Sequence, residues 1–311
     1  MAVPKCEWVG PRIAIMLAAL LMLPVMAQDK ESAQRWEKEA MEWREQRLER
    51  LTAPFGWLSL VGLEFLPDGE WAVGSSVDSD VRLPSGPDRW GVLTFARPRA
   101  WFEPAEGAEV LLGEQRLEAR RELIVAGEEP ATRVSAGTGW FEIARRGDRL
   151  VLRARDSEAS TRREFLGLEY FDFDPDWRIE ARWEAHPGGS TIPVADVLGE
   201  LRDQPNPGRA VFSVAGREHA LEALEAEDQL FFIFADRTSG RSTYGLGRFL
   251  YSDLPADGHV VLDFNRAYNP PCAFNAYTTC PLPPPENRLD LYVEAGELRY
   301  RGSGGIQPSD L

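Results

Sequence analysis

Residues 139–156 read GWFEIARRGDRLVLRARD, and this stretch decides the fold class. It holds two short apolar runs, GWFEIAR (139–145) and RLVLRARD (149–156), on either side of Gly147 and Asp148. Runs of this length that contain Val, Ile, Phe and Trp and are bounded by turn-forming residues are typical of strands. The stretch therefore predicts two β-strands.

The same pattern extends upstream of this stretch. Apolar runs of strand length alternate there with Gly, Pro and Asp, at intervals of roughly 8–12 residues. These runs are WLSLVGL (57–63), EWAVG (70–74), DVRLP (80–84), GVLTF (91–95) and AEVLL (108–112). Short strands at this spacing are typical of sandwiches and barrels. Residues 55–156 are therefore predicted to form a β-sandwich-like domain.

Part of this region resembles a known β-sandwich. The string PDGEWAVGSSVDSDVRLPSG (67–86), followed by GVLTF, resembles the beginning of a forkhead-associated domain, a family that reads phosphothreonine. Ser75 stands where that family has an Arg, and no Ser-x-x-His follows. The resemblance therefore implies a sandwich shape and does not extend to phosphopeptide binding.

The second half of the chain is also predicted to be β-rich. In DWRIEARW (176–183), large and apolar side chains alternate with charged ones, which is the period of a half-buried strand. The runs Leu230–Phe234 and Val260–Leu262 are apolar on both faces and predict central strands. We expect a mainly β fold with a second β-rich domain at 157–301, and a disordered Gly- and Ser-rich tail at 302–311.

A helix is predicted ahead of the strands, at residues 28–54. Trp36, Ala40, Trp43, Leu48 and Leu51 recur at spacings that keep them near one helix face. Charged residues fill the other face, and the Pro and Gly that follow end the helix. Its predicted role is to pack the tryptophans against the β-structure.

Residues 1–27 have the pattern of a secretory signal peptide. Lys5 and Arg12 flank an apolar run at 13–27, which is shorter than the roughly 20 residues that a membrane-spanning helix needs. The segment predicts export, to the periplasm or the extracellular space, with no stable membrane span after cleavage. An uncleaved membrane anchor is the alternative.

Composition narrows the functions that are open to the chain. The net charge of −15 over 311 residues disfavours nucleic-acid partners, because like charges repel the phosphate backbone.

Cys6 falls within the signal, which leaves Cys272 and Cys280 as a pair that predicts a disulfide in an oxidising compartment. A free nucleophile or two thiolate ligands are the alternatives. Two cysteines without a nearby His are too few for zinc, and we expect neither a metal nor a cofactor.

Polar and aromatic residues concentrate at 236–297. Two strands predicted to be buried each end in an aspartate, Asp236 and Asp263, and a polar loop follows each. Rigid strand ends commonly position functional groups, so these two aspartates are the candidate catalytic pair. The candidate ligand-binding residues are Thr238, Ser239, Thr243, Tyr244, Arg248, Asn265, Arg266, Tyr268, Asn269, Asn287 and Glu297.

Several chemistries fit this block. The two aspartates could act as general acid and base, as in glycoside cleavage. The arginines could hold a carboxylate or phosphate, and the tyrosines could stack on a flat group. None of the three histidines lies within the polar segments 234–248, 262–274 and 280–297, to which His259 comes closest, and no nucleophile-elbow motif occurs. The structural alternative is that Arg248 and Arg266 only form buried ion pairs with Asp236 and Asp263.

The block also carries a family resemblance. The strings LDFNRAYNPPCAF (262–274), CPLPP (280–284) and NRL (287–289), with DRTSGRSTYG (236–245) and GRFL upstream, resemble an uncharacterised prokaryotic family labelled only as a domain of unknown function. GWLSL (56–60) and RARD (153–156) extend the resemblance along most of the chain. It implies no activity and no cofactor.

Three functions therefore stay open. The first is an extracytoplasmic binder of a small polar molecule, or an enzyme acting on one as a carboxylate-dependent hydrolase, with its site in the C-terminal β-domain. The second is a non-catalytic envelope or interaction module in which the block at 236–297 is structural. The third is a redox protein that uses Cys272 and Cys280.

Overall fold

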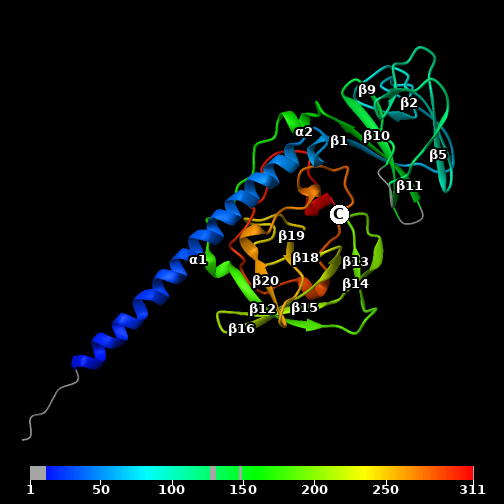
Figure 1. Cartoon of the computed structure of the whole chain (residues 1–311). Coiled ribbons are helices and arrows are strands. Elements are labelled where there is room, and N and C mark those ends of the chain that lie inside the picture. The colour runs from blue at the N-terminus through cyan, green and yellow to red at the C-terminus, as the bar shows by residue number, and fades with distance from the viewer. Residues whose placement is uncertain (1–11, 127–130, 147–148, 311) are drawn as a thin grey trace, which may run out of the picture.

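The computed structural model describes residues 12–126, 131–146 and 149–310, and for 12–29 only the course of the backbone. The chain is mainly β, which confirms the predicted fold class. One long helix, α1 (Arg12–Thr52), precedes the strands and runs past the second β-region (Figure 1). The predicted signal peptide, residues 1–27, lies outside the part of the chain whose side chains are described. In the described part, no helix is both long and apolar enough to cross a bilayer.

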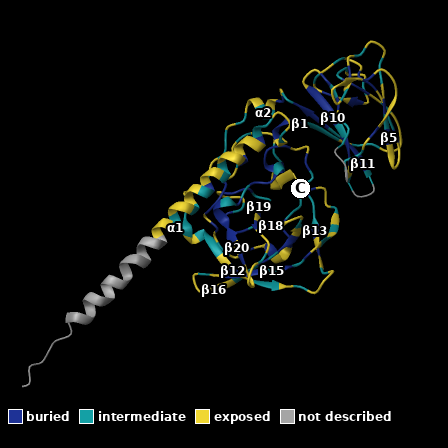
Figure 2. Ribbon diagram, in the orientation of Figure 1, coloured by how far each residue is buried: buried dark blue, intermediate teal, exposed yellow. Residues whose placement is uncertain are grey.

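The first β-region is a sandwich of a six-stranded and a five-stranded sheet. Phe102 of one sheet meets Phe141 of the other with ring centroids 5.3 Å apart, inside a shared core. Figure 2 colours the buried residues of the ribbon, which include most of β10 (Gly139–Arg146). The six strands are β1 (Leu60–Phe65), β11 (Arg149–Asp156), β10 (Gly139–Arg146), β9 (Val134–Ala136), β6 (Leu111–Leu112) and β7 (Gln115–Arg116), in sheet order. The five are β3 (Val81–Arg82), β2 (Gly69–Gly74), β4 (Gly91–Ala96), β5 (Arg99–Pro104) and β8 (Arg121–Leu123).

The stretch 139–156 forms the longest strand pair of this sandwich. β10 and β11 are antiparallel along their whole length, from Gly139 opposite Asp156 to Arg146 opposite Arg149. Phe141, Ile143 and Leu152 are buried because alternate side chains face the core. The prediction of two strands here is confirmed.

The second β-region contains three smaller sheets. The first comprises β16 (Arg217–Glu222), β15 (Gly208–Val214), β12 (Arg178–Ala185) and β20 (His259–Asp263), in that order. The others are β17 (Leu224–Ala226), β18 (Gln229–Phe234) and β19 (Arg248–Asp253), and the hairpin β13 (Thr191–Ala195) and β14 (Leu201–Pro205). Short helical turns connect them: α2 (Ser160–Arg163), η1 (Trp57–Ser59), η2 (Pro175–Trp177), η3 (Phe264–Arg266), η4 (Pro271–Ala273), η5 (Pro285–Asn287) and η6 (Pro308–Asp310).

The position of β20 differs from the prediction of a central strand. β20 is the edge strand of its sheet, next to β12. Val260 and Leu262 face the core, whereas Val261 is 38% exposed. The run Val260–Leu262 has an apolar outward face because Val261, on that face, lines a cleft. Among the residues that the structure describes, no second layer of core is packed against it.

Two other predictions concern the C-terminal loops. Cys272 and Cys280 are buried free thiols, so the predicted disulfide is wrong. The backbone N–H of Cys272 instead donates to the sulfur of Cys280 at 3.1 Å, which closes the loop without a covalent bond. Residues 302–310, predicted to be disordered, lie against the body, where Ile306 N–H donates to the Cys272 carbonyl and the Tyr244 hydroxyl donates to the Ile306 carbonyl.

Candidate functional site

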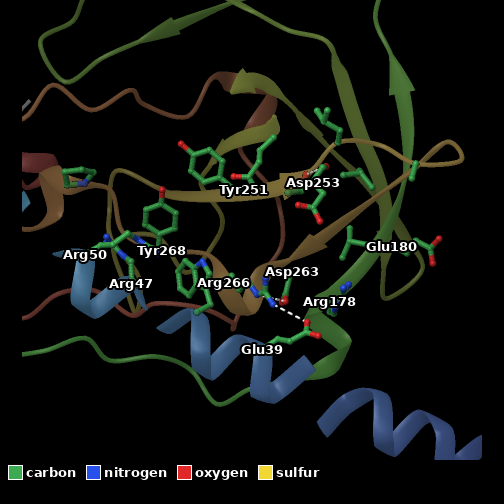
Figure 3. Close-up of a pocket in the computed structure, with 18 of the residues that line it drawn as sticks. Glu39, Arg47, Arg50, Arg178, Glu180, Tyr251, Asp253, Asp263, Arg266 and Tyr268 are labelled. Atoms are coloured by element: carbon green, nitrogen blue, oxygen red, sulfur yellow. Dashed lines mark hydrogen bonds and ion pairs between the residues drawn. The ribbon is translucent and has the colours of Figure 1, made fainter. Parts of the chain in front are cut away.

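A cleft of about 1250 Å³ lies between α1 and the second β-region. Its walls come from α1, the loop 55–57, strands β12, β19 and β20, the segment that follows β20, and single residues of β11 and β18, Arg155 and Gln229 (Figure 3). The lining contains five arginines and five carboxylates, so its formal charges cancel although the chain carries −15. The cleft is therefore much less acidic than the chain as a whole and tolerates a ligand with anionic groups.

One end of the cleft is built around Asp263, the last residue of β20. Its carboxylate caps the η3 turn by accepting from the backbone N–H of Asn265 at 3.2 Å, which fixes its orientation. Arg266, on the same turn, lies with Nε 3.3 Å from Asp263 Oδ2 and Nη2 3.4 Å from Glu39 Oε2 of α1. Arg178 of β12 is the direct cross-strand neighbour of Asp263. These four side chains converge at one end of the cleft (Figure 3).

Three buried polar atoms at this end have no hydrogen-bond partner among the described residues. They are Arg178 Nε, Asp263 Oδ2 and Arg266 Nε. The last two atoms lie 3.3 Å apart as an ion pair, but their contact does not have the geometry of a hydrogen bond. Unsatisfied buried polar atoms are rare because each costs about 1–3 kcal/mol. A donor and acceptor set of this kind on a cleft wall suits a polar ligand.

An aromatic wall continues the cleft from Asp263. Tyr251 and Tyr268 stack with 6.5 Å between ring centroids and 11° between ring planes. Arg47 of α1 lies over the Tyr268 ring at 4.6 Å and donates to the Asn269 carbonyl at 2.9 Å. Burial raises the pKa of both tyrosine hydroxyls, so they remain protonated and can donate hydrogen bonds. This wall suits a flat or partly apolar group.

Asp236, the other candidate catalytic residue, is enclosed in the core. Its Oδ2 accepts from Arg248 Nη2 at 2.9 Å, and the two side chains are 0% and 1% exposed. Its Oδ1 accepts from the backbone N–H of Thr238 at 2.7 Å. Asp236 does not line the cleft, whereas Asp263 does. The structure therefore does not bring the two carboxylates into one hollow.

Most other residues of the predicted site hold loops in place through polar contacts within the protein. Asn287 shows this most clearly, because it donates to the carbonyls of Glu222 and Ile233 and accepts from the Glu222 N–H. The others with such internal contacts are Thr238, Ser239, Thr243, Tyr244, Arg248, Asn265, Asn269 and Glu297. Of the predicted set, Asp263, Arg266 and Tyr268 line the cleft. The ion pairs of Arg248 and Arg266 follow the structural alternative.

The sequence did not single out several residues of the cleft. Glu39 belongs to a helix that was predicted only to pack against the body, and Tyr251 lies in β19. Arg178 lies in the alternating string DWRIEARW, on the face opposite the tryptophans, which was a usable signal. Arg155 stands in the string RARD that carried the family resemblance.

Comparison with known proteins supports the family resemblance. Residues 163–298 match the family described as "Protein of unknown function (DUF1684)", so the resemblance to a family of unknown function is confirmed, although GWLSL and RARD lie outside the matched range. An uncharacterised protein of Haloarcula marismortui, known from a solution NMR structure, is 34% identical over 44% of this chain and 78% of its own, with a TM-score of 0.37. A search of the curated proteins gives no match.

Proposed function

Because the chain belongs to the DUF1684 family through residues 163–298, and that description assigns no activity, we propose a function from the geometry: binding of a small polar ligand in the cleft beside α1, outside the cytoplasm. The observation that carries this proposal is the set of atoms without a hydrogen bond on Arg178, Asp263 and Arg266, of which Asp263 Oδ2 and Arg266 Nε form an ion pair 3.3 Å apart. The extracytoplasmic location follows from the signal-type segment at residues 1–27.

Each wall of the cleft contributes a different interaction. Asp263 Oδ2 would accept from a hydroxyl or amine of the ligand, and the guanidinium groups of Arg178 and Arg266 would donate to an oxygen. Tyr251 and Tyr268 would cover a flat or apolar part. The volume of about 1250 Å³ is slightly above the range typical of small-molecule sites, roughly 300–1,000 Å³, so the cleft has room for a ligand larger than a single sugar or amino acid.

Binding is favoured over hydrolysis by the predicted pair of Asp236 and Asp263. A hydrolase of that kind needs two carboxyl groups on either side of the bond that is broken. Asp263 faces the cleft, but Asp236 is paired with Arg248 in the core. The candidate catalytic pair is thus incomplete at this cleft.

A thermal-shift screen of the purified full chain tests the proposal. Oligosaccharides, short peptides, nucleosides and di- and tricarboxylates are the probe classes, and at least one class is expected to raise Tm in a concentration-dependent manner. Asp263→Asn keeps the oxygen that caps η3 but removes the charge, and Arg178→Gln removes a guanidinium. Each is expected to weaken binding about 10- to 100-fold, the usual cost of a lost charged hydrogen bond.

Arg237→Gln is the matched control, because Arg237 is exposed and pairs with Asp290 away from the cleft. It should bind like wild type. The proposal fails when no probe class shifts Tm, or when Asp263→Asn and Arg178→Gln bind as tightly as the control.

A second candidate, a non-catalytic interaction module, is favoured by one observation. The side chains of the signature block mostly make internal hydrogen bonds, as Asn287 does between Glu222 and Ile233. Under this alternative, substitutions in the block unfold the protein, and the cleft variants have no effect on any ligand. The same screen therefore separates the two candidates.

A further inference from the structure

Arg155 is a buried arginine at the end of the cleft away from Asp263. It lies near the C-terminus of β11 and is 8% exposed, and its side chain lines the cleft. Gly56 lies between Arg155 and α1. Arg155 Nη1 donates to the Gly56 carbonyl at 2.6 Å, and Gly56 packs so closely against α1 that a Cβ built on it would lie 2.6 Å from the Arg50 carbonyl. Arg155 and Arg50 therefore belong to the same end of the cleft, beside the C-terminus of α1.

The contacts of Arg155 leave part of its guanidinium unused. All its recorded hydrogen bonds come from Nη1, to the carbonyls of Phe55 and Gly56 and to Ser59 Oγ. Nε is buried and has no partner among the described residues. The rings of Trp57 and Trp140 lie 5.6 and 5.4 Å from the guanidinium carbon and hold its plane in place. The guanidinium is thus rigid and only partly satisfied.

The charge of Arg155 is also unbalanced. Within the described residues, no carboxylate lies at ion-pair distance from Arg155 or from Arg50. Burial lowers the pKa of Arg155 to about 10, and the charges of Arg153 and Arg133 act in the same direction, while the carboxylate of Glu142, which pairs with Arg153, opposes them. The side chain remains a cation at neutral pH. A buried cation without a counter-charge is unfavourable, and a bound anion would relieve this.

We propose that Arg155 and Arg50 form an oxyanion subsite, so that the ligand of the cleft carries a carboxylate or phosphate group at this end. The inference rests on the proposed function and adds the chemical class of the ligand. Guanidinium groups suit both oxyanions because their planar donors match two oxygens at once.

The two ends of the cleft set the shape of that ligand. Glu39, beside Arg266, and Arg50 are eleven residues apart on α1, which corresponds to about 16 Å along the helix axis. Figure 3 shows Arg50 at one end of the labelled set, and Asp263 and Arg178 well away from it, with Glu180 beyond them. A ligand that contacts both ends is extended, with its oxyanion beside Arg155 and a hydroxyl or amine beside Asp263.

Isothermal titration and thermal shift on the purified full chain test the subsite. The probes are inorganic phosphate, pyrophosphate and citrate at constant ionic strength, with sodium chloride as the reference salt. Wild type is expected to bind at least one of them with a dissociation constant on the order of millimolar or below, and the ranking of the probes distinguishes phosphate from carboxylate.

Two variants and two controls identify the residues responsible. Arg155→Gln is expected to weaken oxyanion binding at least tenfold. Arg50 is exposed, so Arg50→Gln is expected to fold normally. This variant should weaken oxyanion binding several-fold, and it tests the subsite even if Arg155→Gln does not fold. Arg237→Gln should bind like wild type. Arg217→Gln, which removes another exposed guanidinium away from the cleft, should also bind like wild type.

The outcomes separate this inference from the proposed function. The subsite is overturned if oxyanions and chloride stabilise the protein equally. It is also overturned if Arg50→Gln and any folded Arg155→Gln both bind oxyanions as wild type does. In either case Arg155 only holds loop 55–57 in place. If uncharged oligosaccharides still bind in a manner sensitive to Asp263→Asn, the proposed function stands without the subsite. If no probe binds, both fail.

Discussion

Asp236 and Arg248 form an ion pair in the core of the second β-region, with Oδ2 and Nη2 2.9 Å apart. The pair connects the end of β18 to the start of β19, and Arg248 also donates to the carbonyls of Val293 and Ala295. One guanidinium thus connects the ends of two neighbouring strands to a segment that lies 45 or more residues further along the chain.

The first prediction concerns this ion pair. Asp236→Asn leaves the Arg248 charge buried without a counter-ion, and the expected loss is about 3–5 kcal/mol of unfolding free energy. Urea denaturation followed by circular dichroism measures it. Arg237→Gln, at the exposed neighbouring position, is the control and should show no measurable change. A stability loss equal to that of the control would contradict the assignment of Asp236 to the core.

The sequence pattern predicted the strands but not which aspartate faces the cleft. Asp236 and Asp263 look equivalent in sequence, because each ends an apolar run and begins a polar loop. They differ in the structure because β18 is the middle strand of its sheet, with Arg248 on the neighbouring strand β19, whereas β20 is an edge strand beside α1. The sheet order that decides this is a tertiary property, which local periodicity does not contain.

The residues that the sequence missed were missed for the same reason. Glu39, Arg155 and Arg178 belong to elements outside the block at 236–297, and only the fold brings them to one cleft. The predicted disulfide was wrong for another reason, because an even number of cysteines gives no information on geometry. Cys272 and Cys280 are adjacent in space as free thiols.

The second prediction concerns Asn287, whose side chain makes three hydrogen bonds with the backbone of Glu222 and Ile233. Asn287→Ala would leave two carbonyls and one N–H without partners in a buried position, where each unsatisfied group costs about 1–3 kcal/mol. The expected loss of unfolding free energy is therefore about 3 kcal/mol or more, measured by urea denaturation. Gln115→Ala on the exposed strand β7 is the control. Equal losses for the two variants would show that the Asn287 contacts add nothing to stability.

The third prediction separates conformational strain from steric clash at glycine. Gly296 has φ of +82°, and a Cβ there would lie 2.5 Å from the Ala267 carbonyl and 2.7 Å from the Phe264 carbonyl. Gly216 has a similar φ of +74° but no atom within 4 Å of the same position. Both Ala variants are expected to lose about 1 kcal/mol or more from the left-handed backbone.

Gly296→Ala is expected to lose clearly more than Gly216→Ala, because the two carbonyl oxygens belong to backbone and must move. Thermal denaturation of the two variants side by side measures the difference. Equal losses would mean that the segment after β20 yields easily and does not hold Gly296 in place.

The fourth prediction concerns the pH dependence that Glu297 creates. Glu297 is fully buried, and its Oε2 lies 3.4 Å from Arg47 Nε of α1. Burial raises its pKa above the ordinary value of 4.5, although Arg47 and Asn269 oppose the rise. The folded protein therefore binds this proton more tightly than the unfolded chain does. Between 4.5 and the raised folded pKa, the contribution of Glu297 to stability falls as pH rises.

Glu297→Gln removes the titration but keeps a side chain of similar size. The unfolding free energy of this variant, relative to wild type, is expected to increase from pH 4.5 upward and to level off above the folded pKa of Glu297. Urea denaturation at several pH values from 4.5 to neutral measures this difference. Glu294→Gln, at an exposed position three residues earlier, is the control and should differ from wild type by a constant amount. If the difference in unfolding free energy between Glu297→Gln and wild type is also constant with pH, the carboxyl has the same pKa in the folded and unfolded states. The contacts with Arg47 and Asn269 would then fully offset the effect of burial on that pKa.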